Sequence, residues 1–221
     1  MASAADAAGR SSRWLIGCDR SGTSTTSTPR SRGFACSSTR NWTILGVPKS
    51  SPNLARVEGL RDDFDACDRL LEQAEAQAGS SAVAKVRIDL ELGRKLRSSG
   101  DPESALPLFV AAFARARDSG EHYLAGDAAH MCALAVSDDR AAMEEWTRRG
   151  LDLGEREPDA AYWAGPLLNN LGWAYFDAGE HEHALELFER ALEVRRLDPD
   201  NQDAIAFAEE AVETARQALG T

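Results

Sequence analysis

The fold is decided by residues 168–199, which read LNNLGWAYFDAGEHEHALELFERALEVRRLDP. Small and large apolar residues recur there at fixed steps, at Leu168, Leu171, Gly172, Tyr175, Gly179, Ala184, Phe188, Ala191 and Pro199. The steps on either side of Gly179 follow the period of a helix, and glycine commonly stands just past a helix end. We therefore expect two antiparallel helices joined by a short turn at Gly179-Glu180.

A second copy of this pattern begins at Asp89. It continues with Leu92, Gly93, Leu96, Gly100, Ala105, Phe109 and Ala112. The two copies lie two steps of roughly 39 or 40 residues apart, which predicts a weaker copy between them. That copy falls on a helix rich in small residues at 123–136, followed by Trp146 where the other copies have Phe.

The same period extends the pattern outward in both directions. The predicted units are approximately 52–78, 84–117, 121–156 and 159–198, with a capping helix at 202–219. A single hairpin is too small to bury its apolar face, so neighbouring hairpins must stack, with Gly93 and Gly172 where helices cross and with Phe109 and Phe188 filling the remaining space. No segment from residue 54 onward alternates like a strand, so we expect an all-α chain.

The pattern resembles the tetratricopeptide repeat (TPR), strongly over residues 85–116 and 160–200 and more weakly over the rest of 54–219. The usual Trp of the first slot is Asp89 or Leu168 here. The resemblance implies an α-solenoid of about four and a half repeats, wound as a right-handed superhelix with a concave groove that binds peptides. It is closest to small bacterial, actinobacterial-like proteins of this class.

Residues 1–51 differ from the rest in composition, since Ser and Thr abound and Glu is absent. One interpretation is a disordered tail that buries too little apolar area to fold. The other rests on codons. When residues 21–30 and 35–45 are back-translated with G or C at third positions and read one base earlier, acidic and helix-like strings appear. We hypothesise that residues 14–50 are a frameshifted reading of a normal first helix.

The charge of the chain is unevenly distributed. The net charge is -11, and the seven basic and two acidic residues of 1–49 leave -16 on the remainder. Such an acidic body disfavours binding to nucleic acids or to anionic membranes. Four dispersed Cys without metal-ligand spacing favour a reducing, cytoplasmic location. A lipoprotein-like box at 15–18 lacks the apolar stretch that should precede it.

We expect no catalytic residues, metal or cofactor, because no nucleophile motif, phosphate loop or helical His pair is present. His181 and His183 stand two apart, so their side chains should diverge on a helix. Solvated turn residues are the simpler interpretation of this Glu-His-Glu-His stretch.

The candidate site is the groove lined by the first helix of each hairpin. The residues expected to face it are Arg87, Leu90, Arg94, Arg97, His130, Ala133, Val136, Asn169, Asn170, Trp173 and Phe176. Among these, Arg, His and Asn would suit an acidic peptide, with Arg binding carboxylate and Asn binding the peptide backbone. The alternatives are salt bridges to Glu91 or Asp89 for the arginines and interhelical packing for the two aromatic residues. If the groove assignment holds, replacing Asn170 and Arg94 by Ala should abolish binding and leave the melting temperature nearly unchanged.

These features predict an adaptor that binds a peptide segment of a partner protein. The alternative is a regulatory sensor whose groove binds a signalling peptide or a small molecule. The incomplete first repeat would also leave an apolar face exposed, which could drive self-association.

Overall fold

The computed structural model describes residues 51–220, and the predicted head at 1–51 lies almost entirely outside them. All regular structure in the described part is helical. The elements are α2 (Ser51–Gly59), α3 (Phe64–Ala78), α4 (Ala82–Ser98), α5 (Pro102–Asp118), α6 (His122–Ala135), α7 (Arg140–Arg156), η2 (Pro158–Trp163), α8 (Ala164–Asp177), α9 (His181–Arg196) and α10 (Gln202–Leu219). The chain is an all-α solenoid of the tetratricopeptide type.

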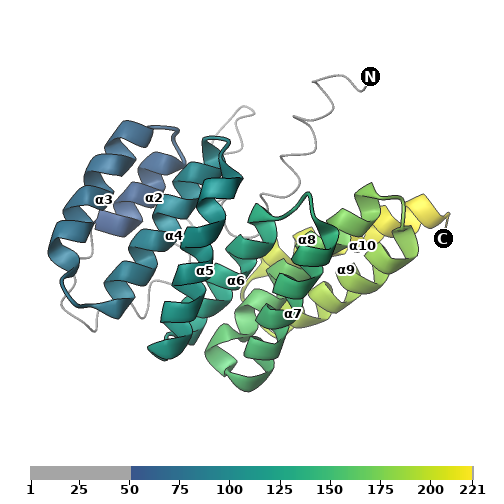
Figure 1. The fold of residues 1–221 in the computed structure, drawn as a ribbon. Helices are drawn as coiled ribbons and strands as arrows, with labels where there is room; N and C mark the ends of the chain where they lie inside the picture. The colour runs from purple at the N-terminus through teal and green to yellow at the C-terminus, as the bar shows by residue number, and fades with distance from the viewer. Residues whose placement is uncertain (1–50, 221) are drawn as a thin grey trace, which may run out of the picture.

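The helices form a row of antiparallel hairpins that runs from α2 and α3 at one end to α9 and α10 at the other (Figure 1). The first helices of successive hairpins contact each other, α2 with α4, α4 with α6, α6 with α8 and α8 with α10. The second helices pack mainly on first helices. Because the first helices approach one another more closely, they form the inner side of the curved row.

Short capping motifs fix where the helices begin. Asp63, Ser81, Asp101, Asp139 and Asn201 each accept a hydrogen bond from the backbone N–H three residues further on. Each cap satisfies an amide that the helix itself leaves unpaired. At the ends of α4 and α8, Gly100 and Gly179 have φ of 91° and 81°, a left-handed conformation that favours glycine. The turn predicted at Gly179 is therefore confirmed.

Two of the hairpins, α4–α5 and α8–α9, close through a glycine that contacts a large ring. A Cβ added to Gly93 would lie 2.4 Å from Phe109, and one added to Gly172 would lie 2.5 Å from Phe188. Both phenylalanines are fully buried. The predicted pairing of small and large residues at helix crossings is confirmed, because only the absence of a side chain lets each ring approach the facing helix.

The junction between α7 and α8 contains an element that the repeat pattern did not predict. The 3₁₀ helix η2 precedes α8, packs against α6 and α7, and carries the buried Trp163. A Cβ on Gly126 of α6 would lie 2.4 Å from this indole. The third and fourth hairpins are thus joined by a packed 3₁₀ helix rather than by a simple turn.

The two ends of the row differ in surface character. On α2, Leu54 and Val57 are 46% and 39% exposed, and Leu60, just after the helix, is 51% exposed. On α10, Glu209, Glu210 and Glu213 are exposed, and Ala208, Ala211, Val212 and Ala215 are buried. The C-terminal helix thus covers the core with a charged outer side, whereas α2 presents apolar side chains.

Candidate binding site on the first helices

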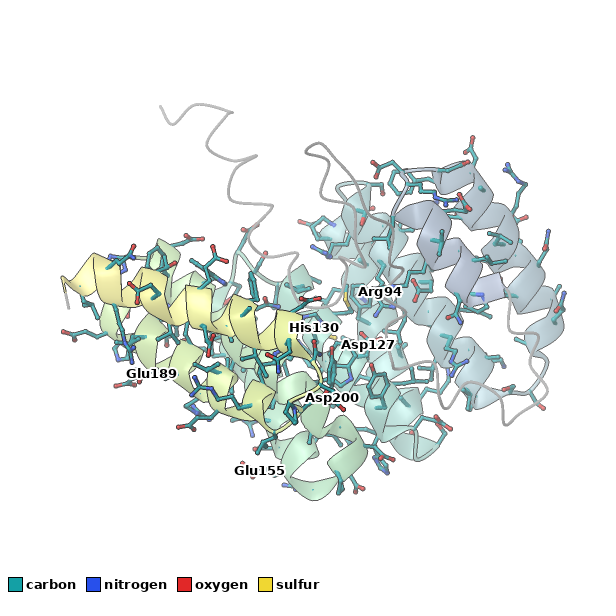
Figure 2. All side chains as sticks on the ribbon, turned by 180° about the vertical axis from the view of Figure 1, so that it is seen from behind. Arg94, Asp127, His130, Glu155, Glu189 and Asp200 are labelled. Carbon is teal, nitrogen blue, oxygen red and sulfur yellow. The ribbon has the colours of Figure 1, made fainter. Side chains whose placement is uncertain are left out.

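The inner side of the row is formed by α4, α6 and α8, which carry the residues that the sequence assigns to the groove. Figure 2 views the molecule from behind and shows Arg94, Asp127 and His130 close to one another at its centre. These three side chains lie at the centre of the candidate site.

Arg94 on α4 forms the first part of the cluster. Its guanidinium donates to Glu91 Oε1 at 2.6 Å and, through Nη2, to Asp127 Oδ2 of α6 at 2.6 Å. These three side chains are between 10% and 13% exposed. Arg94 therefore does form the salt bridge to Glu91 that was the alternative to ligand binding. It also links two repeats, which the sequence did not predict.

His130 on α6 and Asn170 on α8 form the second part. The Asn170 amide nitrogen lies 2.9 Å from His130 Nε2, and the imidazole packs on Trp163 with ring centroids 5.3 Å apart. Burial, together with the positive charges of Arg94, Arg97 and Arg195, lowers the pKa of His130 to about 3, although Asp127 opposes this. The imidazole is therefore neutral at physiological pH, so its Nε2 accepts a hydrogen bond from the Asn170 amide.

This arrangement corrects the expectation that Arg94 and Asn170 can be removed without loss of stability. Asn170 is 1% exposed and holds a buried histidine, and Arg94 pairs with the buried Asp127 and the partly buried Glu91. Their replacement by Ala would leave buried polar groups unpaired. Neither variant would therefore test binding alone.

Asn169 is the exceptional member of the site. It is 3% exposed, and neither its amide nitrogen nor its carbonyl oxygen has a hydrogen-bond partner among residues 51–220. Buried amides are normally paired, and leaving one unpaired costs about 1–3 kcal/mol. Packing alone gives no reason for an amide at this position.

Arg87 and Arg97 extend the site along α4. Burial lowers the pKa of both guanidinium groups; the neighbouring charge of Arg94 lowers that of Arg97 further, and Glu121 partly offsets the effect at Arg87. Within residues 51–220, Arg97 forms no ion pair. It lines a pocket of about 30 Å³ between α2 and α4, together with Arg56, Arg94 and Lys95. Glu91 also lines this pocket. Arg56 and Arg94 pair with Glu91 and Lys95 pairs with Asp68, so among these cations Arg97 is the one without an ion pair in the described part of the chain.

The two aromatic residues of α8 occupy different positions from those of the arginines. Trp173 is 7% exposed and packs on Phe188, with ring centroids 4.9 Å apart. Phe176 packs edge-on against Trp173 and also contacts His181. These contacts are interhelical packing, which was the alternative to ligand binding for the two aromatic residues.

Two residues of this region were missed by sequence reasoning. Asp127 lies on a helix of small residues, and only its contact with Arg94 across two hairpins reveals its part in the site. Arg195 comes from α9, a second helix, and is 8% exposed. The sequence could have indicated Arg195, because it is a cation on the buried face of α9 and charged residues are rarely buried.

The Glu-His-Glu-His stretch does not converge on a common point. His181 contacts the ring of Phe176, whereas His183 contacts that of Tyr175. Among residues 51–220, no group of three or more His, Cys, Asp or Glu side chains is placed to hold a metal ion.

Comparison with known proteins supports the repeat type. A tetratricopeptide-repeat family model matches residues 167–197, which include Asn169 and Asn170. No curated protein matches the chain. None of the described helices combines the length and apolar character needed to cross a membrane.

Proposed function

We propose that the chain is a protein-interaction module whose first helices bind an extended peptide segment of a partner. Tetratricopeptide repeats in general mediate protein–protein interaction, and the match at 167–197 covers the hairpin that carries Asn169. The observation that carries the proposal is the buried, unpaired amide of Asn169. A peptide backbone offers both a donor and an acceptor, and so satisfies both atoms of such an amide.

The charge near the amide defines the kind of peptide. Arg97 has no counterion within the described part of the chain, and Arg87 is half buried. Arginine binds carboxylates through two parallel hydrogen bonds, so acidic segments are favoured. Because the Asn169 amide is covered, binding requires the side chains above it to move, and association should be slower than the diffusional encounter.

The test is a selection of random peptides on the purified full chain, followed by affinity measurement on two variants. Asn169→Ala should weaken the selected peptides about tenfold or more, because it removes both hydrogen bonds at once. Asn53→Ala removes the same group from an exposed position on α2 and should leave affinity unchanged. Failure to enrich any peptide, or equal binding by both variants, would reject the proposal.

The same experiment separates an adaptor from a sensor. An adaptor should bind peptides embedded in a longer chain as well as free ones. A sensor for a signalling peptide or small molecule should bind only the free ligand, and its binding should alter the contacts of a second protein. The adaptor is favoured because the site extends over α4, α6 and α8, which is longer than a small molecule requires.

We also propose a cytoplasmic location and self-association. A cytoplasmic location is supported by Cys67 and Cys132, the two cysteines of the described part of the chain, which are buried free thiols. Self-association is supported by the exposed apolar row on α2. Light scattering over a range of concentrations tests the second point: Val57→Glu should abolish any dimer, whereas a wild-type chain that stays monomeric would contradict the idea.

A further inference from the structure

The first hairpin, formed by α2 and α3 at one end of the row (Figure 1), stands apart from the main core of the chain. That core runs from Val86 on α4 to Leu171 on α8. The buried side chains of the first hairpin belong to two small clusters, and among the described residues neither cluster contains an aromatic ring. Their buried members are Ala55, Cys67 and Leu71 in one and Ala74, Ala78, Ala84 and Ile88 in the other. Because most of these side chains are small, separating the hairpin from α4 would expose little apolar surface.

Charged contacts hold the hairpin against α4. Lys95 Nζ donates to both carboxylate oxygens of Asp68 at 2.7 Å, and Arg56 Nη1 lies 3.6 Å from Glu91 Oε2. The Lys95 and Asp68 side chains are 19% and 42% exposed, so dissolved salt can screen their attraction. Ion pairs with this exposure contribute little stability, so the contact is weak and sensitive to salt.

A small pocket lies beneath the hairpin. It has a volume of about 30 Å³ and is lined by Gly59 and Leu60 on one side, by Arg97 and Ser98 of α4 on the other, and by Cys67 of α3. A pocket of this size holds about one water molecule and excludes a peptide side chain. With the first hairpin in place, a partner therefore cannot reach Arg97 through this pocket.

The connection between the hairpin and α4 permits movement. Gly79 follows α3 with φ of 51° and ψ of -125°, a conformation that glycine adopts without steric cost. Ser80 and Ser81 come next, and α4 begins at Ala82. A few residues at the end of an element are sufficient to absorb the backbone change of a hinge. The hairpin can thus turn about Gly79 while α4 stays in the main core.

We propose that the first hairpin is a lid that opens at Gly79 and controls access to Arg97. In the closed state the Lys95–Asp68 pair holds the lid on α4. In the open state α2 and α3 stay packed on each other, while Arg97 and Cys67 become accessible. The opening itself is independent of any ligand, but its role in binding rests on the proposed function, since Arg97 belongs to the proposed peptide site.

Cys67 reports the opening of the lid, and Cys132 is its internal control. Both thiols are buried, but Cys132 lies in the main core. The experiment uses the full chain with Cys18→Ser and Cys36→Ser, so that only these two thiols remain. Iodoacetamide labelling without denaturant is followed by mass spectrometry. Cys67 should be labelled about tenfold faster than Cys132 or more, because local opening takes less free energy than global unfolding, and faster still at high salt.

A second reagent distinguishes opening from entry through the pocket. N-ethylmaleimide is bulkier than iodoacetamide. If the lid opens, both reagents should show the same protection of Cys67 relative to their rates with free cysteine, because both react with the open state. Protection that increases with the size of the reagent would mean that the closed pocket admits it, and would overturn the inference.

Two lysines of α4 provide a variant and its matched control. Lys95→Met removes the cation of the ion pair, and should speed Cys67 labelling about twofold to fivefold, reduce its salt dependence and leave Cys132 unchanged. Because Lys95 lies on α4, it is remote from Cys67 in the open state, so the reactivity of the exposed thiol is the same in both chains. Lys85→Met changes an exposed lysine of the same helix and should behave as the wild type does.

Equal labelling of Cys67 and Cys132 would overturn the lid, and so would equal effects of the two lysine variants. Should Lys95→Met fail to fold, the salt dependence of Cys67 labelling in the wild-type sequence decides the question, since a rate that does not rise with salt contradicts the role of the ion pair.

The role in binding is tested by adding a peptide selected on the full chain. A peptide that binds the open state should speed Cys67 labelling, whereas slower or unchanged labelling would overturn the control of access. Failure to select any peptide would reject the proposed function and leave the opening of the lid standing. A selected peptide that binds a chain whose Cys67 is labelled no faster than Cys132 would do the reverse.

Discussion

Arg94 and Asp127 lie 33 positions apart and form a partly buried ion pair that joins the second repeat to the third. The same guanidinium also neutralises Glu91. Three charged side chains therefore occupy the interface between α4 and α6, where the other contacts are largely apolar. The stability of this interface depends on all three being present together.

Removal of one partner should be far more harmful than removal of the pair. Arg94→Ala leaves the buried Asp127 without its cation and Glu91 with only the more distant Arg56, and should lower the free energy of unfolding by about 3 kcal/mol. The double variant Arg94→Met with Asp127→Leu should lose much less. Urea unfolding of the single and double variants checks this, and additive losses would show that the ion pair carries no coupling.

Gly172→Ala should destabilise the fourth hairpin by about 1–3 kcal/mol, the usual cost of overpacking. The added methyl group would lie 2.5 Å from Phe188, which is fully buried. Phe188→Leu in the same chain should restore part of the loss by making room. Thermal unfolding measures both variants, and a neutral Gly172→Ala would mean that the ring moves aside freely.

The protonation of His130 should make stability depend on pH. Its pKa is about 3 in the folded chain and about 6.5 when unfolded, so the unfolded chain binds the proton more tightly. Stability from this group is complete above pH 6.5 and is lost as the pH falls toward 3. At pH 5 the loss should be about 2 kcal/mol relative to pH 7.

The matched variant for this effect is His130→Leu, which cannot take up the proton. Carboxylates also titrate in acid, so the informative quantity is the difference in unfolding free energy between the two chains at each pH. That difference should shift in favour of the variant as the pH falls from 7 to 5. A constant difference would mean that His130 is not buried as a neutral group.

Asn169→Leu should raise the free energy of unfolding by about 1 kcal/mol or more, because it replaces an unpaired buried amide by an apolar group of similar size. Asn170→Leu should instead lower it, because His130 loses its partner. Calorimetry of the two variants provides the comparison. If Asn169→Leu is destabilising, the amide has a structural partner and the argument for binding is weakened.

The fold was predictable because its determinants are local and repeated. Gly93 with Phe109 and Gly172 with Phe188 stand at the same spacing in two copies, and the structure brings each pair into contact. Stacking then follows, since no single hairpin can bury its apolar face. The head at 1–51 lies almost entirely outside the described residues, so the structure tests neither of its two interpretations.

The site was less predictable because it depends on contacts between repeats. The sequence placed Arg94 and Asn170 on the inner helices, but their partners Asp127 and His130 follow only from the distance between α4, α6 and α8. Arg195 could not be found from the repeat pattern. Its position depends on Gly165 and on η2, which follows no repeat register.

The contrast between α2 and α10 has a consequence for protein engineering. A solenoid grows by adding a hairpin to an apolar end, and within residues 51–220 such an end is formed by α2 and the turn after it, through Leu54, Val57 and Leu60. Designed repeats should therefore be grafted before α2, where they would extend the row beside the pocket that Arg97 lines. Grafts after α10 would meet glutamates and would first require that helix to be redesigned.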